Sequence, residues 1–96
     1  MSTLGDAKQV YKDAKEAFAT HDFEAATEKS KEAALSGLSC LGEVSELGNA
    51  AEKLELDDHL SSVISFLVEM GADQASKGLR YAKEVLTYVE ERLNTA

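Results

Sequence analysis

The chain has 96 residues, of which 44% are hydrophobic and only 6% aromatic, and it contains no proline and no tryptophan. Its net charge of −8 argues against partners that need a concentrated Lys/Arg face, namely nucleic acids and anionic membranes. One cysteine excludes an internal disulfide, and neither a signal-peptide pattern nor a membrane-length apolar run is present. We therefore expect a single domain over residues 1–96, in the cytoplasm.

The N-terminal segment has helical periodicity. Thr3 and Asp6 have the spacing of a capping box, which predicts a helix from there to about Ala19. The apolar face of this helix is marked by Leu4, Ala7, Tyr11, Ala14 and Phe18.

A second helix is predicted to begin after Asp22, a good N-cap residue, with its inner face at Phe23, Ala26, Ser30, Ala33 and Ala34. If it ran unbroken to Leu54 it would be roughly 48 Å long, about twice the first helix. Gly42 and Gly48 offer stop signals, since glycine accepts the left-handed conformation that ends many helices. We favour a break or sharp bend at one of them, followed by a segment with Val44, Leu47, Ala51 and Leu54 on one face.

The segment from His59 to Met70 is the most apolar part of the chain. Asp57 or Asp58 is expected to cap it, and Gly71 to end it. Because apolar residues surround nearly the whole helix, it is either central in a bundle or covered by a second subunit. On the second alternative Leu60, Ile64 and Phe66 are candidate partner-binding residues.

A last helix is predicted to begin near Asp73, with an apolar stripe at Ala75, Leu79, Ala82, Leu86, Val89 and Leu93. Tyr81 and Tyr88 are seven residues apart and so lie on one flank of this helix. They either border the core with their hydroxyls in water or form a partner-binding edge.

The chemistry-bearing residues form no complete catalytic set. On one continuous helix Glu55 and His59 would share a face, but two ligands fall short of a stable metal site, and an exposed histidine beside acidic caps is the alternative. Cys40 lies in Gly37-Leu-Ser-Cys-Leu-Gly42, which lacks the pattern of a nucleophile turn or a phosphate loop. Its small residues suit close approach of a neighbouring helix. We expect no metal and no cofactor.

Residues 16–54 resemble the histidine phosphotransfer (HPt) domain of phosphorelays. The resemblance is carried by Glu16-Ala-Phe-Ala-Thr-His-Asp-Phe-Glu-Ala-Ala, by Ser36-Gly37-Leu-Ser-Cys-Leu-Gly42, and by the stretch from Leu47 through Glu52 to Leu54. It implies a four-helix up-and-down bundle. The positions of the phosphoryl-accepting histidine and the motif lysine fall at Ala33 and Ser36, so the resemblance implies a relative that binds without transferring phosphate.

The pattern His21-Asp-Phe-Glu-Ala-Ala is also similar to lactose/cellobiose-type IIA phosphocarriers, which the chain resembles again at Asp58-His59-Leu60. The position of their accepting histidine is Glu55. Around residues 21–38 the chain looks like HEPN-type bundles, without the R-x-x-x-x-H nuclease signature, and like a single tetratricopeptide helix pair. All of these families agree on a helical hairpin within a bundle.

The sequence thus predicts an all-α, four-helix up-and-down bundle. Its predicted function is that of a small acidic interaction module without enzymatic activity, which binds a protein partner or itself. The alternative is a phosphocarrier that uses His59 as its phosphoryl acceptor.

Overall fold

The computed structural model describes residues 3–95, so the two ends of the predicted 1–96 domain lie outside the described residues. Five α-helices and two short 3-10 helices make up this part of the chain, and none of its residues is in a strand. The elements, in order, are α1 (Leu4–Ala19), α2 (Phe23–Leu38), η1 (Leu47–Asn49), α3 (Ala50–Lys53), α4 (Asp58–Glu69), η2 (Ala72–Gln74) and α5 (Ala75–Thr95). The all-helical prediction is confirmed, and α3 is one helix more than four.

The helix starts lie where the capping residues predicted them. The Thr3 hydroxyl accepts from the Asp6 amide at 3.1 Å, and the Asp6 carboxylate accepts from the Thr3 amide at 3.2 Å. Asp22 caps α2 through the Ala25 amide at 3.2 Å, and Asp57 caps α4 through the Leu60 amide at 2.8 Å. Each cap satisfies an amide that has no partner inside its helix.

The first helix ends at Ala19, as predicted, but the left-handed conformation expected of helix-ending glycines is found at other residues. Among the described residues the left-handed conformation is adopted by His21, with a φ of 65°, and Glu55, with a φ of 51°, and by no glycine. His21 follows α1: its amide donates to the Phe18 carbonyl at 3.0 Å, and the Asp22 amide donates to the Ala17 carbonyl at 2.9 Å. This is the Schellman arrangement, built here without glycine.

The second helix ends at Leu38, four residues before Gly42, so a continuous helix to Leu54 does not form. The single proton of the Ser39 hydroxyl is shared between the carbonyls of Leu35 at 2.8 Å and Val44 at 3.2 Å, which ties the following loop to the end of α2. The chain then enters η1 and α3. The expected third segment is therefore two short elements rather than one amphipathic helix.

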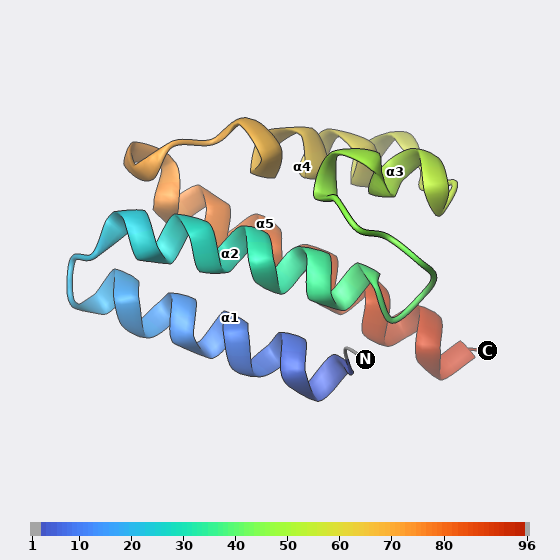
Figure 1. The fold of residues 1–96 in the computed structure, drawn as a ribbon, viewed down its shortest axis with the longest axis horizontal. Helices are drawn as coiled ribbons and strands as arrows, with labels where there is room; N and C mark the ends of the chain where they lie inside the picture. Colours follow the sequence, from blue (N-terminus) through green and yellow to red (C-terminus); the bar gives the residue numbers. More distant parts are fainter. Residues whose placement is uncertain (1–2, 96) are drawn as a thin grey trace.

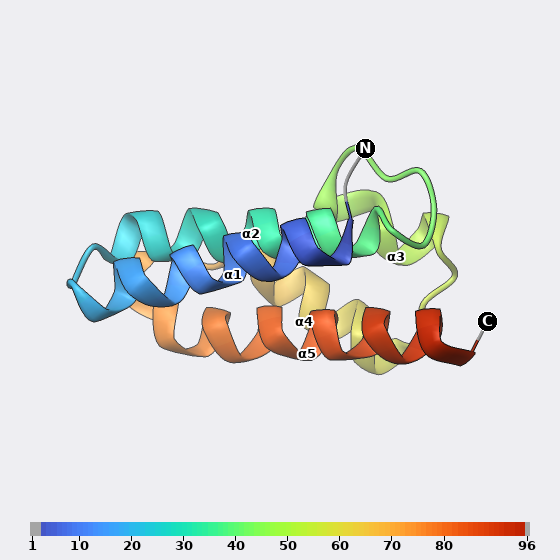
Figure 2. The same cartoon turned by 90° about the horizontal axis from the view of Figure 1, so that it is seen from below.

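Helices α1, α2 and α5 pack against one another, and α4 packs against α5 and α2 (Figures 1 and 2). Following the colours in Figure 1, the successive long helices α1, α2, α4 and α5 alternate in direction. The largest fully buried side chains include Leu38, Leu67, Val85 and Val89, contributed by α2, α4 and α5. Helix α5 thus lies in contact with α1 on one side and α4 on another.

Gly37 is a point of close approach between α2 and α5. A Cβ atom at this position would lie 2.6 Å from Leu86 Cδ2, which is shorter than any ordinary carbon contact. The expectation that this small-residue stretch admits a neighbouring helix is confirmed at Gly37.

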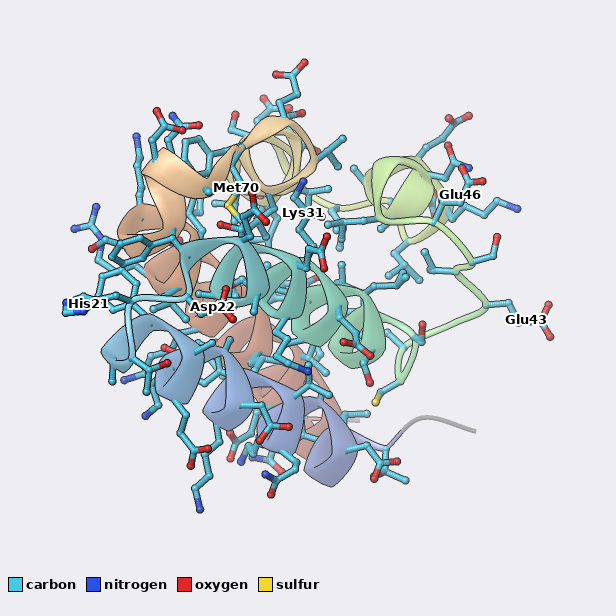
Figure 3. The ribbon with its side chains drawn as sticks, turned by 60° about the vertical axis from the view of Figure 1, so that its left-hand side comes forward. His21, Asp22, Lys31, Glu43, Glu46 and Met70 are labelled. Atoms are coloured by element: carbon cyan, nitrogen blue, oxygen red, sulfur yellow. The ribbon has the colours of Figure 1, made fainter. Side chains whose placement is uncertain are left out.

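The apolar helix α4 is covered within the bundle. Leu60, Val63, Ile64 and Leu67 are all buried. At the end of the helix, Lys31 extends from α2 and its ammonium donates to the Val68 carbonyl at 3.3 Å, where the helix dipole favours a cation (Figure 3). Met70, which follows, is also buried (Figure 3). A second subunit is therefore not needed to cover this helix.

Candidate functional site

Two of the predicted partner-binding residues are not on the surface. Leu60 is 5% exposed and Ile64 is 2% exposed, and both belong to the main core cluster. Their expected role as surface contacts is corrected, because a partner could reach them only if α4 left the bundle. The large exposed apolar side chain of this helix is instead Val68, at 41%.

Phe66 and Tyr81 form an aromatic contact between α4 and α5. Their ring centroids are 4.9 Å apart and the ring planes are inclined by 78°, an edge-to-face geometry. The Lys77 ammonium lies 4.7 Å from the Phe66 centroid and 5.4 Å from that of Tyr81. One cation thus sits over two half-buried rings, an arrangement favoured by the negative faces of both.

Tyr88 continues this surface along α5. It is half-buried against the core, and the Arg92 guanidinium carbon lies 5.9 Å from its ring centroid. Both tyrosines therefore flank the buried stripe of α5 as their spacing predicted. We call Phe66, Lys77, Tyr81, Tyr88 and Arg92 the α4–α5 face.

His59 contacts Glu84, a residue 25 positions away on α5, through its Nε2 atom. The hydrogen bond and charge of Glu84 raise the pKa of His59 above its ordinary value, and the charge of Asp57 adds to the increase. The proposed pairing with Glu55 does not occur on one helix, because Glu55 is in the left-handed turn that ends α3 and His59 is in α4. Within residues 3–95 no group of three His, Cys, Asp or Glu side chains could hold a metal ion.

Cys40 lies just after α2, and it is half-buried. Its sulfur is 3.5 Å from the Ser36 carbonyl oxygen. Burial, followed by the charge of Asp6, raises the pKa of this thiol, which lowers the fraction of nucleophilic thiolate. A shallow hollow of the 39–45 loop adjoins Cys40, and no histidine lines it.

A groove between α1 and α5 was not anticipated from the sequence. Four of the ten basic residues line it, namely Lys8, Lys12, Lys15 and Lys83. Among the described residues the ion pairs are Lys8 with Glu90, and His59 with Glu84. The spacing of Lys8, Lys12 and Lys15 on one helix face was the available signal, but Lys83 joins them only in the folded chain.

No helix of the described residues is both long enough and apolar enough to cross a membrane. No family model, curated protein or solved structure matches this chain. The function must therefore be inferred from the surfaces of the molecule itself.

Proposed function

We propose that this chain is a small acidic interaction module without enzymatic activity, built as a four-helix up-and-down bundle with α3 inserted before its third long helix. In this proposal the α4–α5 face is the contact surface, and the chain acts in the cytoplasm without a cofactor and without binding nucleic acid. The partner is another protein or a second copy of the chain.

The observation that carries the proposal is the cluster of aromatic and cationic side chains on this face. Tyrosine and arginine are enriched among residues that dominate binding energy, because they combine large apolar area with a polar group. Phe66, Tyr81 and Tyr88 are fixed by contacts with the core, so little side-chain freedom is lost on binding. Lys77 and Arg92 stand over the rings, where a partner's carboxylates can pair with them.

The absence of enzymatic activity is supported by the placement of the reactive groups. His59 and Glu84, the described histidine–carboxylate pair, lie on the outer surface with more than a third of each side chain exposed. The groove and the loop hollow described above contain no histidine. An acid–base pair without a recess for a substrate has nothing to orient a reactant against it.

The experiment is a pull-down from the lysate of the native host with tagged wild-type chain and two variants. Lys77→Glu together with Arg92→Glu reverses both cations of the face and leaves the packed rings in place. Phe23→Ala is the matched control, since Phe23 is an exposed aromatic residue in another part of the bundle. Loss of a stoichiometric partner with the double variant alone is the expected result. Equal capture by all three proteins would contradict a role for this face.

Self-association is measured separately by sedimentation velocity of the purified chain over a hundredfold concentration range. A monomer–dimer equilibrium that the double variant weakens identifies the second copy as the partner. A monomer throughout, together with a blank pull-down, would contradict the interaction module itself.

The phosphocarrier alternative depends on His59, whose ring is exposed and oriented by Glu84. However, the Glu84 carboxylate is bonded to Nε2, and together with Asp57 it repels an incoming phosphoryl group. We therefore favour the interaction module over the phosphocarrier. Transfer of labelled phosphate from the host lysate tests the alternative. Label lost in His59→Ala and kept in His21→Ala would favour it, and label kept in both would exclude it.

A further inference from the structure

The groove between α1 and α5 has a cationic rim and an apolar floor. Lys8, Lys12, Lys15 and Lys83 line it with exposed side chains, and Tyr11 and Leu86 lie between them. Its volume is about 380 Å³, within the range of ordinary ligand sites. We call it the lysine groove.

The charge of the lysine groove is opposite to that of the molecule. Four lysines are lined up against a single carboxylate, that of Glu90, in a chain of net charge −8. At physiological ionic strength charges are screened beyond about 8 Å, so carboxylates on distant faces of the molecule contribute little to the potential in the groove. Lys8 is 3.1 Å from Glu90, whereas neither Lys12 nor Lys83 forms an ion pair with a described residue.

Tyr11 gives the floor both an apolar surface and a polar end. The Lys15 ammonium lies 5.4 Å from the centroid of its ring. Burial raises the pKa of the Tyr11 hydroxyl, so this group stays protonated and can donate a hydrogen bond. An occupant that carries both apolar groups and anions would match this combination.

We propose that the lysine groove binds an acidic, amphipathic helical segment of a partner protein. Lys8, Lys12 and Lys15 follow one another at the i, i+4 and i+7 positions of α1 and extend over roughly 10 Å. Carboxylates at the same spacing on a partner helix can each pair with one of these lysines. A leucine between the carboxylates can pack on Tyr11 and Leu86.

Other anionic occupants match these features less well. A single phosphate group can contact only part of the row of lysines. The described lining also contains no arginine, the residue that binds phosphate through two parallel hydrogen bonds. A nucleic acid or an anionic membrane would extend past the groove onto the acidic remainder of the surface and be repelled there. A short acidic segment remains within the groove.

The inference does not depend on the α4–α5 face. The lysine groove uses Lys83 and Leu86 of α5, whereas that face uses Lys77, Tyr81 and Tyr88 of the same helix. The two sets flank opposite edges of its buried stripe. Variants in one surface therefore leave the other intact, and either proposal can fail alone.

The test uses fluorescein-labelled helical peptides of about 14 residues with Glu at every third or fourth position and Leu between them. The same peptides with Gln in place of Glu are the neutral set. Fluorescence anisotropy with the full chain should show binding of the Glu set that weakens with salt. Amide shifts in the ¹⁵N spectrum should concentrate around Tyr11 and Thr87, which line the groove.

Charge variants then locate the site. Lys12→Glu together with Lys15→Glu should weaken binding about tenfold, while two substitutions of equal charge outside the groove, Lys29→Glu and Lys53→Glu, should change it by less than about twofold. Glu90→Gln should strengthen binding by about two- to threefold, because it removes the carboxylate that competes for Lys8. Circular dichroism checks that each variant is folded.

Three results would overturn the proposal. The first is equal binding of the Glu and Gln sets, or of none of the peptides. The second is displacement of the peptides by inorganic phosphate at the same concentration as the peptides themselves, which would identify a small-anion site. The third is a set of groove shifts that grow with protein concentration without peptide, which would make a second copy the occupant.

Discussion

At the scale of single residues, Glu55 holds the turn between α3 and α4 in a conformation that suits glycine better. Its amide donates to the Glu52 carbonyl at 3.3 Å, and the Leu56 amide donates to the Ala51 carbonyl at 2.9 Å, with Glu55 itself at a φ of 51°. For a residue with a Cβ atom, this conformation costs about 1–2 kcal/mol of stability. Glycine avoids that cost but loses more conformational entropy on folding, which offsets part of the difference.

Glu55→Gly is therefore expected to raise the free energy of unfolding by about 0.5–1 kcal/mol, measured by urea denaturation. Glu55→Asn should give a smaller gain, because asparagine tolerates the left-handed region, and Glu55→Val should destabilise. Glu55→Gln controls for the lost charge and should have little effect. A Gly variant no more stable than the Gln variant would contradict the assignment of strain to this residue.

His59 gives a second prediction at this scale. Because Glu84 raises the pKa of His59 in the folded chain, the protonated ring stabilises the fold below the unfolded pKa of about 6.5. That contribution is lost as the pH rises from there through the higher folded value. An NMR titration of the His59 ring should give a pKa above 6.5, and Glu84→Gln should lower it toward that value.

Glu91→Gln is the matched control for this titration, since Glu91 is an exposed carboxylate on the same helix. It should leave the pKa of His59 nearly unchanged. A His59 titration that is the same in wild type and in Glu84→Gln would show that the ion pair does not form in solution.

At the scale of elements, the packing of α2 on α5 depends on the missing side chain at Gly37. Gly37→Ala gains about 1 kcal/mol of helix propensity, but the new methyl group displaces the buried Leu86, which costs about 1–3 kcal/mol. We expect a net loss of about 1 kcal/mol in the free energy of unfolding.

Gly5→Ala is the control of opposite sign, because a Cβ there would meet only the Thr3 hydroxyl at an ordinary 3.7 Å. It should stabilise the chain. Shortening the neighbour with Leu86→Val should reduce the cost of Gly37→Ala, so the double variant should lose less than the sum of the two single variants. Strict additivity would contradict a direct contact.

The elements also show what the sequence could and could not predict. Helix starts were predictable because each cap is local: Thr3, Asp22 and Asp57 bond to amides three residues ahead. The end of α1 at Ala19 was predicted as well, but the left-handed positions were not, because glycine was expected there and His21 and Glu55 fill them. The candidate surfaces could not be predicted, because they depend on how α4 and α5 are aligned with each other. Only that alignment brings Glu84 to His59 and Tyr81 to Phe66.

At the scale of the whole molecule, carboxylates are in excess and few are paired. The net charge is −8, and the described ion pairs are two, Lys8–Glu90 and His59–Glu84, both at the surface. Exposed ion pairs contribute little to stability, whereas mutual repulsion of like charges acts over the entire surface. We therefore expect repulsion to be the larger electrostatic effect on stability.

Added salt should for this reason stabilise the fold. Between about 10 mM and 150 mM NaCl the screening length falls from about 30 Å to about 8 Å, which removes long-range repulsion before it removes contacts between paired groups. We expect the thermal midpoint at neutral pH to rise by a few degrees, equivalent to about 1 kcal/mol in a chain of this size. Differential scanning calorimetry at several salt concentrations measures it.

Charge variants distinguish the screening of repulsion from non-specific effects of salt on the thermal midpoint. Glu24→Gln with Glu28→Gln removes two exposed carboxylates from α2 and should flatten the salt dependence, whereas Lys12→Glu in the lysine groove should steepen it. A midpoint that falls with salt, or that responds equally in all three proteins, would contradict the dominance of repulsion. The lysine groove is a local exception to this excess of negative charge, because four lysines line it beside the single lining carboxylate of Glu90.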